Sequence, residues 1–498
     1  MEKLALIELS EVGLKLTFVN TSNGKYKIFK EDMDIYPLYE EVRDNKLLSP
    51  KTISSLLANL KIYKKLIDEN DIEKVIAVTS DFLLKARNQK GFLDEVYNNT
   101  NITFSYITDE ELVKNLYTSV VNSIDNSKGI ILSIGVNQLS VIKYNRRTTL
   151  GSDVLPFGVI STLYDEKGEK RSYEQMVKFA LANLKNINLD FSPDEDVACV
   201  GIGNPFINLG RIAKKIERYP LALDNNYPVS KETFQKVEKF LTELDLEKIK
   251  KVKGIVDNNS DMLMAGLAIV SALYSYFKIK EVAVSTANFG DGIIRNFIGV
   301  DALDRYTDLL ANSFESYREF MPGDTTVNLR VNNMSAVLFK QLKVMHKLPR
   351  VYIKPLRVAS YMFDSGKQVA FDDYEKHGFY TILNSNLAGV SQKDLLLAAF
   401  TCLCQKPDNF NLSEWVKYQA ILTDEDLEAV RKMGIMIKLA VLLNSSKENI
   451  VSDVVCDMLG DSVIMKTIST TDASYEISQG MKIADEYRKL FKKNLQLI

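Results

Sequence analysis

The chain has 498 residues, of which 46% are apolar and 26% charged, so its composition is that of a globular protein of two to four domains. Its 63 basic and 65 acidic side chains leave a formal charge of −2, which argues against a dedicated nucleic-acid surface. The four cysteines form no CxxC pair, and no signal peptide or membrane-length apolar segment is evident. We therefore expect a cytoplasmic protein without membrane attachment.

The first region reads as alternating strands and helices. A hairpin at 4–20 is followed by a helix at 49–70, a buried strand at 73–80 and a helix at 109–124. Strands pattern with period 2 and helices with period 3.6, and both periods are present here. We expect residues 1–125 to form one α/β lobe.

The second region repeats this order. A hairpin begins at Gly129, and then follow a helix at 172–187, a strand at 197–204, a buried helix at 262–277 and a strand at 281–286. The repetition predicts a duplicated domain with a cleft between its halves, the second lobe being 126–305. From 306 to 498 the pattern is helical throughout, which predicts a separate all-α domain.

Several motifs together identify a family resemblance. They are VIAVTSDFLLKARN (75–88), YITDEELVKNLYTSV (106–120), LPFGV (155–159), VGIGNP (200–205) and AVSTANFGDGII (283–294). Their order and spacing resemble the exopolyphosphatase/guanosine-pentaphosphatase (Ppx/GppA) family. The resemblance implies the duplicated two-lobe, RNase H-like fold of actin, sugar kinases and the Hsp70 ATPase, followed by an all-α domain resembling the HD phosphohydrolase fold.

The resemblance also indicates which residues replace the phosphate-binding groups of the first lobe. The family's D-I-G-S-N-S hairpin falls on Glu8 to Gly13, so that Glu8, Ser10 and Glu11 occupy this loop. The Thr-Ser pair of A-T-S-A-x-R falls on Ser80 and Asp81, and its arginine on Leu84. Two acids at the loop would repel phosphate, and one basic group is absent.

The second hairpin shows the same kind of replacement. The family's D-I-G-G-G-S-T-E falls on 133–140, where Ser133 replaces an Asp, Gly135 is kept and Asn137 replaces a glycine. The arginine after L-P-L-G-A falls on Ser161, and the G-G-T turn begins at Gly203. A phosphate cradle uses glycines so that backbone N–H groups can approach the anion. The loop therefore resembles an eroded phosphate loop.

The general base implied by the family is a glutamate at the start of a helix, and this position is Leu112. Glu111 lies one residue earlier, about 100° around the helix. Either Glu111 is a displaced catalytic acid, or it belongs to an acidic first turn that stabilises the helix N-terminus. We expect Glu8, Leu84, Leu112 and Ser133 to converge on the cleft between the lobes.

The helical domain offers no His-Asp pair for HD-type metal chemistry. Phe363 and Asp364 stand at the expected place, and His346 and His377 are isolated in the sequence. We expect no bound metal and no cofactor, with Mg²⁺ required only if the protein is an active phosphohydrolase.

Two functions remain open. One is a weakly active or non-catalytic family member that senses a ligand or binds a protein. The other is an active exopolyphosphatase or guanosine-pentaphosphatase. A kinase-like nucleotide binder is a weaker third reading. Polyphosphate and guanosine nucleotides are the candidate ligands, and a homodimer is the candidate assembly.

Overall fold

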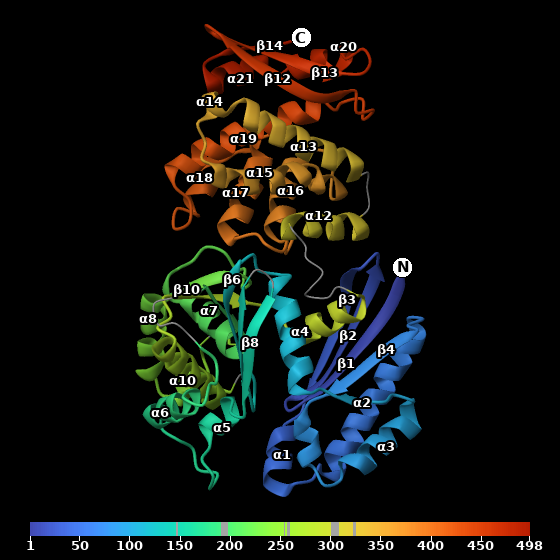
Figure 1. The fold of residues 1–498 in the computed structure, drawn as a ribbon, viewed down its shortest axis with the longest axis vertical. Helices are drawn as coiled ribbons and strands as arrows, with labels where there is room; N and C mark the ends of the chain where they lie inside the picture. The colour runs from blue at the N-terminus through green and yellow to red at the C-terminus, as the bar shows by residue number, and fades with distance from the viewer. Residues whose placement is uncertain (146–147, 191–197, 253, 256–258, 300–307, 322–324) are drawn as a thin grey trace. The chain divides into compact units, whose positions relative to one another are not determined.

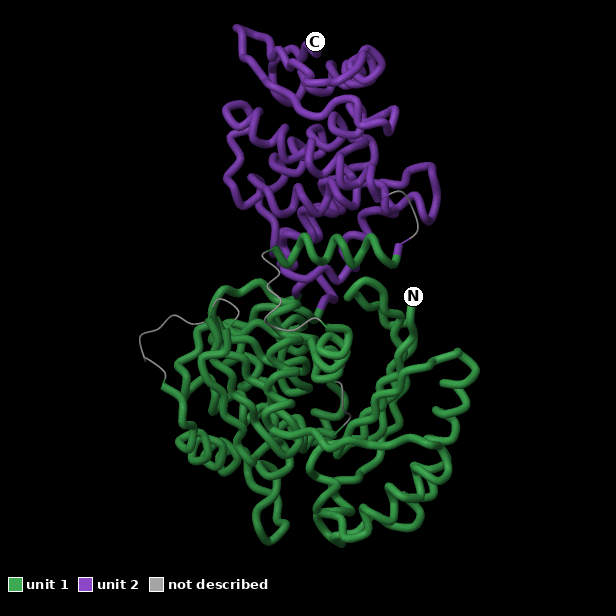
Figure 2. Tube along the Cα trace, turned by 45° about the vertical axis from the view of Figure 1, so that its right-hand side comes forward, with its two compact units in different colours: residues 1–218, 224–320 green, residues 219–223, 321–498 purple. Residues whose placement is uncertain are grey.

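The computed structural model describes residues 1–498 except 146–147, 191–197, 253, 256–258, 300–307 and 322–324. Its chain divides into two compact units, one of residues 1–218 and 224–320 and one of residues 219–223 and 321–498 (Figure 2). The predicted boundary at 305–306 lies outside the described residues. The helix α12 (Leu309–Phe320), on its C-terminal side, belongs to the first unit.

The first lobe is built on a five-stranded sheet in the order β3-β2-β1-β4-β5. β1 pairs antiparallel with β2 and parallel with β4. The strands are β1 (Glu2–Ser10), β2 (Gly13–Ser22), β3 (Lys25–Ile35), β4 (Lys74–Thr79) and β5 (Ser105–Tyr106), with the helices α1 (Leu38–Asn45), α2 (Pro50–Glu69), η1 (Asp81–Lys85) and α3 (Gln89–Thr100).

Successive residues of β1 face opposite sides of this sheet, as a pleated strand requires. Ala5, Ile7 and Leu9 join a buried core that includes residues of α1, α2 and α3. Leu4 and Leu6 pack on the opposite side, and Glu8 follows them in the same alternation. The pleat therefore directs Glu8 away from the helix-covered core.

The second lobe repeats the first. Its sheet has the order β10-β11-β9-β6-β7-β8, so that β8-β7-β6-β9-β11 reproduces β3-β2-β1-β4-β5. The strands are β6 (Lys128–Ile134), β7 (Leu139–Asn145), β8 (Thr148–Leu155), β9 (Ala198–Ile202), β10 (Tyr227–Ser230) and β11 (Glu281–Ser285). The duplicated two-lobe α/β fold is confirmed.

Helices cover the second sheet, and the buried helix predicted at 262–277 is α10 (Ser260–Tyr276). Its partners are α5, α6 and α7. The helices of this lobe are α5 (Val159–Leu163), α6 (Tyr173–Leu184), α7 (Asn204–Ile216), α8 (Lys231–Thr242) and α9 (Leu246–Ile249).

Two helices cross between the lobes. α4 (Asp109–Val121) follows the first sheet in sequence and lies between the two lobes (Figure 1). Its Leu116 and Val120 pack into the core of the second lobe. α11 (Phe289–Phe297) follows the second sheet, but Ile294 packs against the first. The crossing is close, because a Cβ at Gly292 of α11 would lie 2.0 Å from the carbonyl oxygen of Asn115.

The second unit is helical over most of its length. One helix, α17, is buried along nearly its whole length, α19 is buried mainly over its second half, and α13, α15 and α16 pack against them. Its helices are α13 (Thr325–Gln341), α14 (Lys343–His346), η2 (Arg350–Tyr352), α15 (Ile353–Tyr361), η3 (Ser365–Gln368), α16 (Tyr374–Leu383), α17 (Gln392–Leu403), η4 (Pro407–Asn409), α18 (Leu412–Val416), α19 (Asp424–Leu442), α20 (Ser474–Met481) and α21 (Ala484–Phe491).

The prediction that this region is helical throughout is wrong at its end. A three-stranded sheet in the order β12-β13-β14 is formed by β12 (Val451–Leu459), β13 (Ser462–Ser469) and β14 (Asn494–Leu497). β12 and β13 are rich in β-branched residues and are joined at Gly460, whose φ is 54°. This pattern is a local hairpin signal, which the prediction of a wholly helical region did not include. The pairing of β13 with β14 joins segments far apart in sequence.

The side chain of His346, in the second unit, has local hydrogen-bond partners. His346 is buried, its Nδ1 accepts from the N–H of Leu348 at 2.8 Å and its Nε2 lies 2.7 Å from the carbonyl oxygen of Phe339. His377 is partly buried on α16, and Asp364 accepts a hydrogen bond from Asn328 at 2.7 Å.

No helix in the described part of the chain is both long and apolar enough to cross a bilayer.

Replacing Gly292 by Ala tests the helix crossing. The new methyl group would overlap the backbone of α4, and overpacking of this kind costs about 1–3 kcal/mol. We expect a corresponding loss in the free energy of urea unfolding. The control is Gly91→Ala on α3, where nothing lies within 4 Å of the added Cβ and Ala should stabilise the helix by about 0.5–1 kcal/mol. Equal effects of the two substitutions would contradict the close crossing.

Candidate functional site

A cleft of about 350 Å³ lies where the two sheets of the first unit approach each other. Its lining comes from both hairpins, from the ends of β4, β9 and β11, and from the starts of α4, α7 and α11. The polar lining residues are Glu8, Ser10, Glu11, Thr79, Ser80, Asp81, Thr108, Asp109, Ser133, Gln138, Ser140, Asn204, Thr286 and Asn288.

The topology explains this location. β1 and β4 are parallel, as are β6, β9 and β11, so their carboxyl ends lie at one edge of each sheet. Ligands of open α/β sheets bind outside the carboxyl ends of the strands. The fold therefore brings residues from six separate segments to one place that is suited to a ligand.

Glu8 lies at the end of β1 and lines the cleft. Its carboxylate is close to Gly290 of α11, since a Cβ there would lie 2.9 Å from Glu8 Oε2. Burial raises the pKa of Glu8 to about 7; the nearby Lys15 lowers this pKa, while Asp291 raises it. A cleft carboxyl that titrates near neutrality is a candidate functional group.

Glu11 lies in the turn of the first hairpin. Its Oε1 accepts hydrogen bonds from Ser80 Oγ at 3.1 Å and from Asn137 Nδ2 at 3.4 Å. Ser80 follows β4 and Asn137 belongs to the second hairpin. Burial raises the pKa of Glu11, and these two hydrogen bonds oppose the rise. Glu11 thus connects three turns and both lobes.

In the turn of the second hairpin, the backbone N–H and carbonyl groups of Gly135 are both hydrogen-bonded within the protein. The N–H of Gly135 donates to the carbonyl oxygen of Gln138 at 2.9 Å, and the carbonyl oxygen of Gly135 accepts from Val159 at 3.1 Å. A Cβ at Gly203, where φ is 102°, would lie 2.5 Å from the carbonyl oxygen of Ile134. These glycines permit close backbone packing here, so the Gly135 N–H is already engaged within the protein.

Some predicted site residues do not reach the cleft. Leu84 is 54% exposed on η1 and is not among the lining residues, so its expected convergence with Glu8, Leu112 and Ser133 is wrong; those three do line the cleft. The short η1 turn, which a periodicity argument does not resolve, directs Leu84 outward. Ser161 is used locally, with its Oγ accepting from the N–H of Gly158 at 2.9 Å.

Glu111 caps α4 and does not line the cleft. Its Oε2 accepts from the N–H of Thr108 at 2.9 Å, and Thr108 Oγ1 accepts from the N–H of Glu111 at 3.2 Å. These reciprocal hydrogen bonds form a capping box. The neighbouring Leu112 faces the cleft instead. This geometry favours the helix-stabilising interpretation of Glu111.

The cleft is acidic. Its lining includes four carboxylates, of Glu8, Glu11, Asp81 and Asp109, and no lysine, arginine or histidine among the described residues. Sequence reasoning placed Gln138 in the phosphate-loop segment 133–140 but did not place Asp109 or Asn288 at the site. These residues follow a strand or begin a helix at the carboxyl-end edge of a sheet, and this position could have indicated from the sequence that they line the site.

The oxygen atoms that line the cleft are poorly suited to bind a divalent metal. Ser133 stands where the family resemblance places an Asp, and Glu11 is engaged by Ser80 and Asn137. Within the described ranges, no three His, Cys, Asp or Glu side chains are grouped as a metal site. We therefore derive no chemical step through Mg²⁺.

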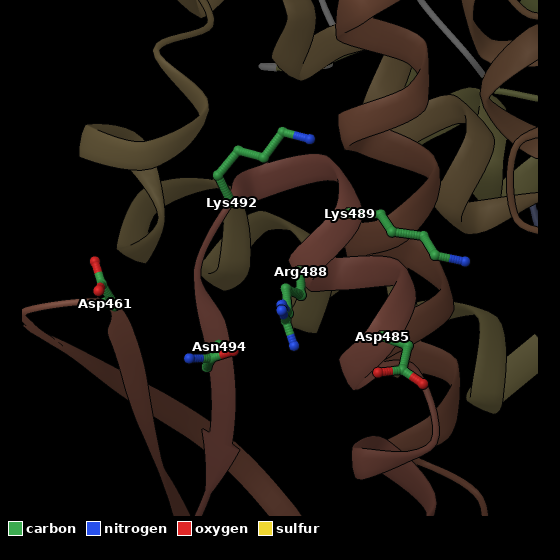
Figure 3. A pocket seen from close by; sticks show the side chains of 6 residues that line it. All are labelled: Asp461, Asp485, Arg488, Lys489, Lys492 and Asn494. Carbon is green, nitrogen blue, oxygen red and sulfur yellow. The ribbon is translucent and has the colours of Figure 1, made fainter.

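Another hollow, of about 730 Å³, lies in the second unit between α21 and the β13-β14 sheet. Figure 3 shows Arg488 between Asn494 and Asp485, while Lys489 and Lys492 point away from Arg488. Its cations do not converge on a common point. The hollow therefore has a less organised set of side chains than the cleft.

Comparison with known proteins identifies the family. The model of the Ppx/GppA phosphatase family matches residues 18–298, and that of Ppx/GppA phosphatase domain III matches residues 315–488. The chain belongs to the Ppx/GppA phosphatase family. The guanosine-5'-triphosphate,3'-diphosphate pyrophosphatase of Aeromonas hydrophila is similar to this family member, with 22% identity over 400 residues, covering 77% of this chain and 76% of the relative.

Other relatives are also distant. The bifunctional 3-dehydroquinate synthase/phosphatase of Fusobacterium nucleatum is 24% identical over 302 residues, covering 57% of this family member and 43% of the relative. The crystal structure of an exopolyphosphatase from Cytophaga hutchinsonii has a TM-score of 0.53 at 16% identity, covering 60% of this chain and 99% of that one. The Ppx/GppA member of Aquifex aeolicus has a TM-score of 0.51 at 20% identity, covering 60% and 97%. At these identities the structural likeness shows the fold alone.

The raised pKa of Glu8 predicts a pH dependence of stability in this family member. The native state retains the proton up to about pH 7, against 4.5 for an ordinary glutamate, so this stabilisation is present below 4.5 and is lost as pH rises through 7. We therefore expect the free energy of unfolding of wild type to fall relative to that of Glu8→Gln as the pH rises from 4.5 through 7. Urea titrations at several pH values measure it. Glu95→Gln, at an exposed site on α3, is the control, and a pH-independent difference for Glu8→Gln would contradict the prediction.

Proposed function

We propose that this protein is a weakly active or non-catalytic member of the Ppx/GppA family that retains the cleft for sensing a ligand or binding a protein. The observation that carries this proposal is the cleft lining, with four carboxylates and no described basic side chain. Family substrates such as polyphosphate are polyanions, and like charges at contact distances are strongly unfavourable inside a protein.

The state of the two loops supports the same proposal. Hydrolysis of a phosphoanhydride depends on preorganised donors that stabilise the charge of the transition state. In this protein the Gly135 N–H donates to Gln138, and the Ser80 hydroxyl and Asn137 amide donate to Glu11. These donors are engaged by the protein itself, which leaves fewer groups to stabilise a phosphate.

The position at which the family has its general base also lacks a suitable side chain. Leu112 lines the cleft and has no proton-accepting group, while the Glu111 carboxylate is held in the capping box. Loss of a positioned general base costs about 10²–10⁴ in rate, and loss of one oxyanion-type donor about 10²–10³. Such effects need not multiply, but either one would make turnover slow.

One observation favours the alternative of an active phosphohydrolase. Glu8 lines the cleft, and burial raises its pKa to about 7. A carboxyl with a pKa near the working pH is suited to general base catalysis. In this alternative Glu8, rather than Glu111, would accept the proton of the attacking water.

Phosphate release from polyphosphate and from guanosine pentaphosphate tests both functions. We expect wild type to be at least about 10²-fold slower than an intact family member assayed in parallel. Glu111→Gln should leave the residual rate unchanged, and Leu112→Glu alone should not restore it. Brisk turnover that Glu8→Gln abolishes would instead establish the enzyme with Glu8 as base. Brisk turnover that Glu111→Gln abolishes would show that the glutamate has shifted by one residue.

A further inference from the structure

We infer that the carboxyl group of Glu11 is an internal substitute for a bound anion: it occupies the meeting point of the hairpin turns, accepts the hydrogen bonds available there and excludes phosphate-type ligands. Glu11 is then a specificity-determining residue of the cleft. This inference rests on the proposed function, because it explains why the cleft would not accept a polyanion.

The hydrogen bonds of Glu11 are those expected of a bound anion. Its Oε1 accepts from a hydroxyl donor after β4, at 3.1 Å, and from an amide donor of the second hairpin, at 3.4 Å. These donors come from turns at the carboxyl ends of parallel strands, where open α/β sheets bind ligands. A phosphate oxygen at the same point would need the same two donors and would have to displace the carboxylate.

Charge strengthens the exclusion. The carboxylate of Asp81 is close enough to Glu11 to interact unfavourably with it, and no lysine, arginine or histidine lines the described cleft. An incoming anion would therefore meet two acidic side chains, and Lys85, the ion-pair partner of Asp81 at 3.9 Å, is exposed and does not line the described cleft. Ser80 and Asn137 already donate to Glu11, so a phosphate would have to break both hydrogen bonds before it could form its own.

The same contact also links the two lobes. Glu11 belongs to the first lobe and Asn137 to the second, 126 positions apart. A second contact of this kind places the guanidinium carbon of Arg43, on α1, 4.5 Å from the ring centroid of Tyr164, directly after α5. Both contacts join the lobes, so an anion that displaced Glu11 would also weaken their closure.

Binding of tripolyphosphate, measured by calorimetry, tests the inference. Glu11→Ala removes both the charge and the side-chain atoms, and Glu11→Gln removes only the charge. We expect Glu11→Ala to bind tripolyphosphate about tenfold more tightly than wild type or better, with Glu11→Gln between the two. The matched control is Asp109→Asn, which removes a charge from the same cleft lining without touching Ser80 or Asn137.

Hydrogen exchange gives a second readout that does not depend on the ligand. Amides of the 135–138 turn should exchange faster in Glu11→Ala than in wild type and should be unchanged in Asp109→Asn. This measurement keeps the inference testable with Glu11→Gln if the alanine variant folds poorly.

The outcomes separate the two proposals. If neither Glu11 variant gains affinity, or if Asp109→Asn gains as much, the internal-anion inference is overturned, while an inert wild type still supports the proposed function. If wild type hydrolyses polyphosphate briskly, the proposed function fails. Because brisk hydrolysis would show that polyphosphate reaches the cleft, it would overturn the exclusion by Glu11 as well.

Discussion

The close crossing of α4 and α11 fixes the relation between the two lobes. A Cβ at Gly292 would lie 2.0 Å from the carbonyl oxygen of Asn115, and the side chains of Asn115 and Asn296 are joined by a hydrogen bond of 2.6 Å. Each helix follows one sheet in sequence and buries its apolar residues against the other. The first turns of both helices line the cleft, so the same packing that joins the lobes also positions Asp109, Leu112 and Asn288.

The cleft combines an inherited framework with an unusual polar lining. The fold that surrounds it is that of the solved Ppx/GppA structures. The Gly135 N–H, the Ser80 hydroxyl and the Asn137 amide, however, donate to other groups of the protein, and the charged side chains that line the described cleft are acids. A buried carboxylate is costly unless hydrogen-bonded, which gives a physical reason for the contacts that Glu11 makes with Ser80 and Asn137. The favourable contacts of Glu11 are thus within the protein.

Sequence patterns identified most of the elements, and their errors have physical causes. The hairpin-first order of both lobes predicted the duplication, because period-2 alternation and glycine turns are local signals. The C-terminal sheet was missed since β14 pairs with β13 only through tertiary contact. Leu84 was misplaced because collinear spacing does not specify where a side chain points on the short turn of η1.

The sequence by itself determined the family, the two-lobe fold and the absence of the expected arginine, glycine and glutamate at matched positions, because residue identity and spacing are written in the chain. Only the tertiary structure decided how the remaining groups are used. It placed Glu111 in a capping box, Leu112 in the cleft and Glu11 between donors from two lobes. Such contacts depend on backbone geometry that joins segments 126 positions apart, and no local pattern specifies that geometry.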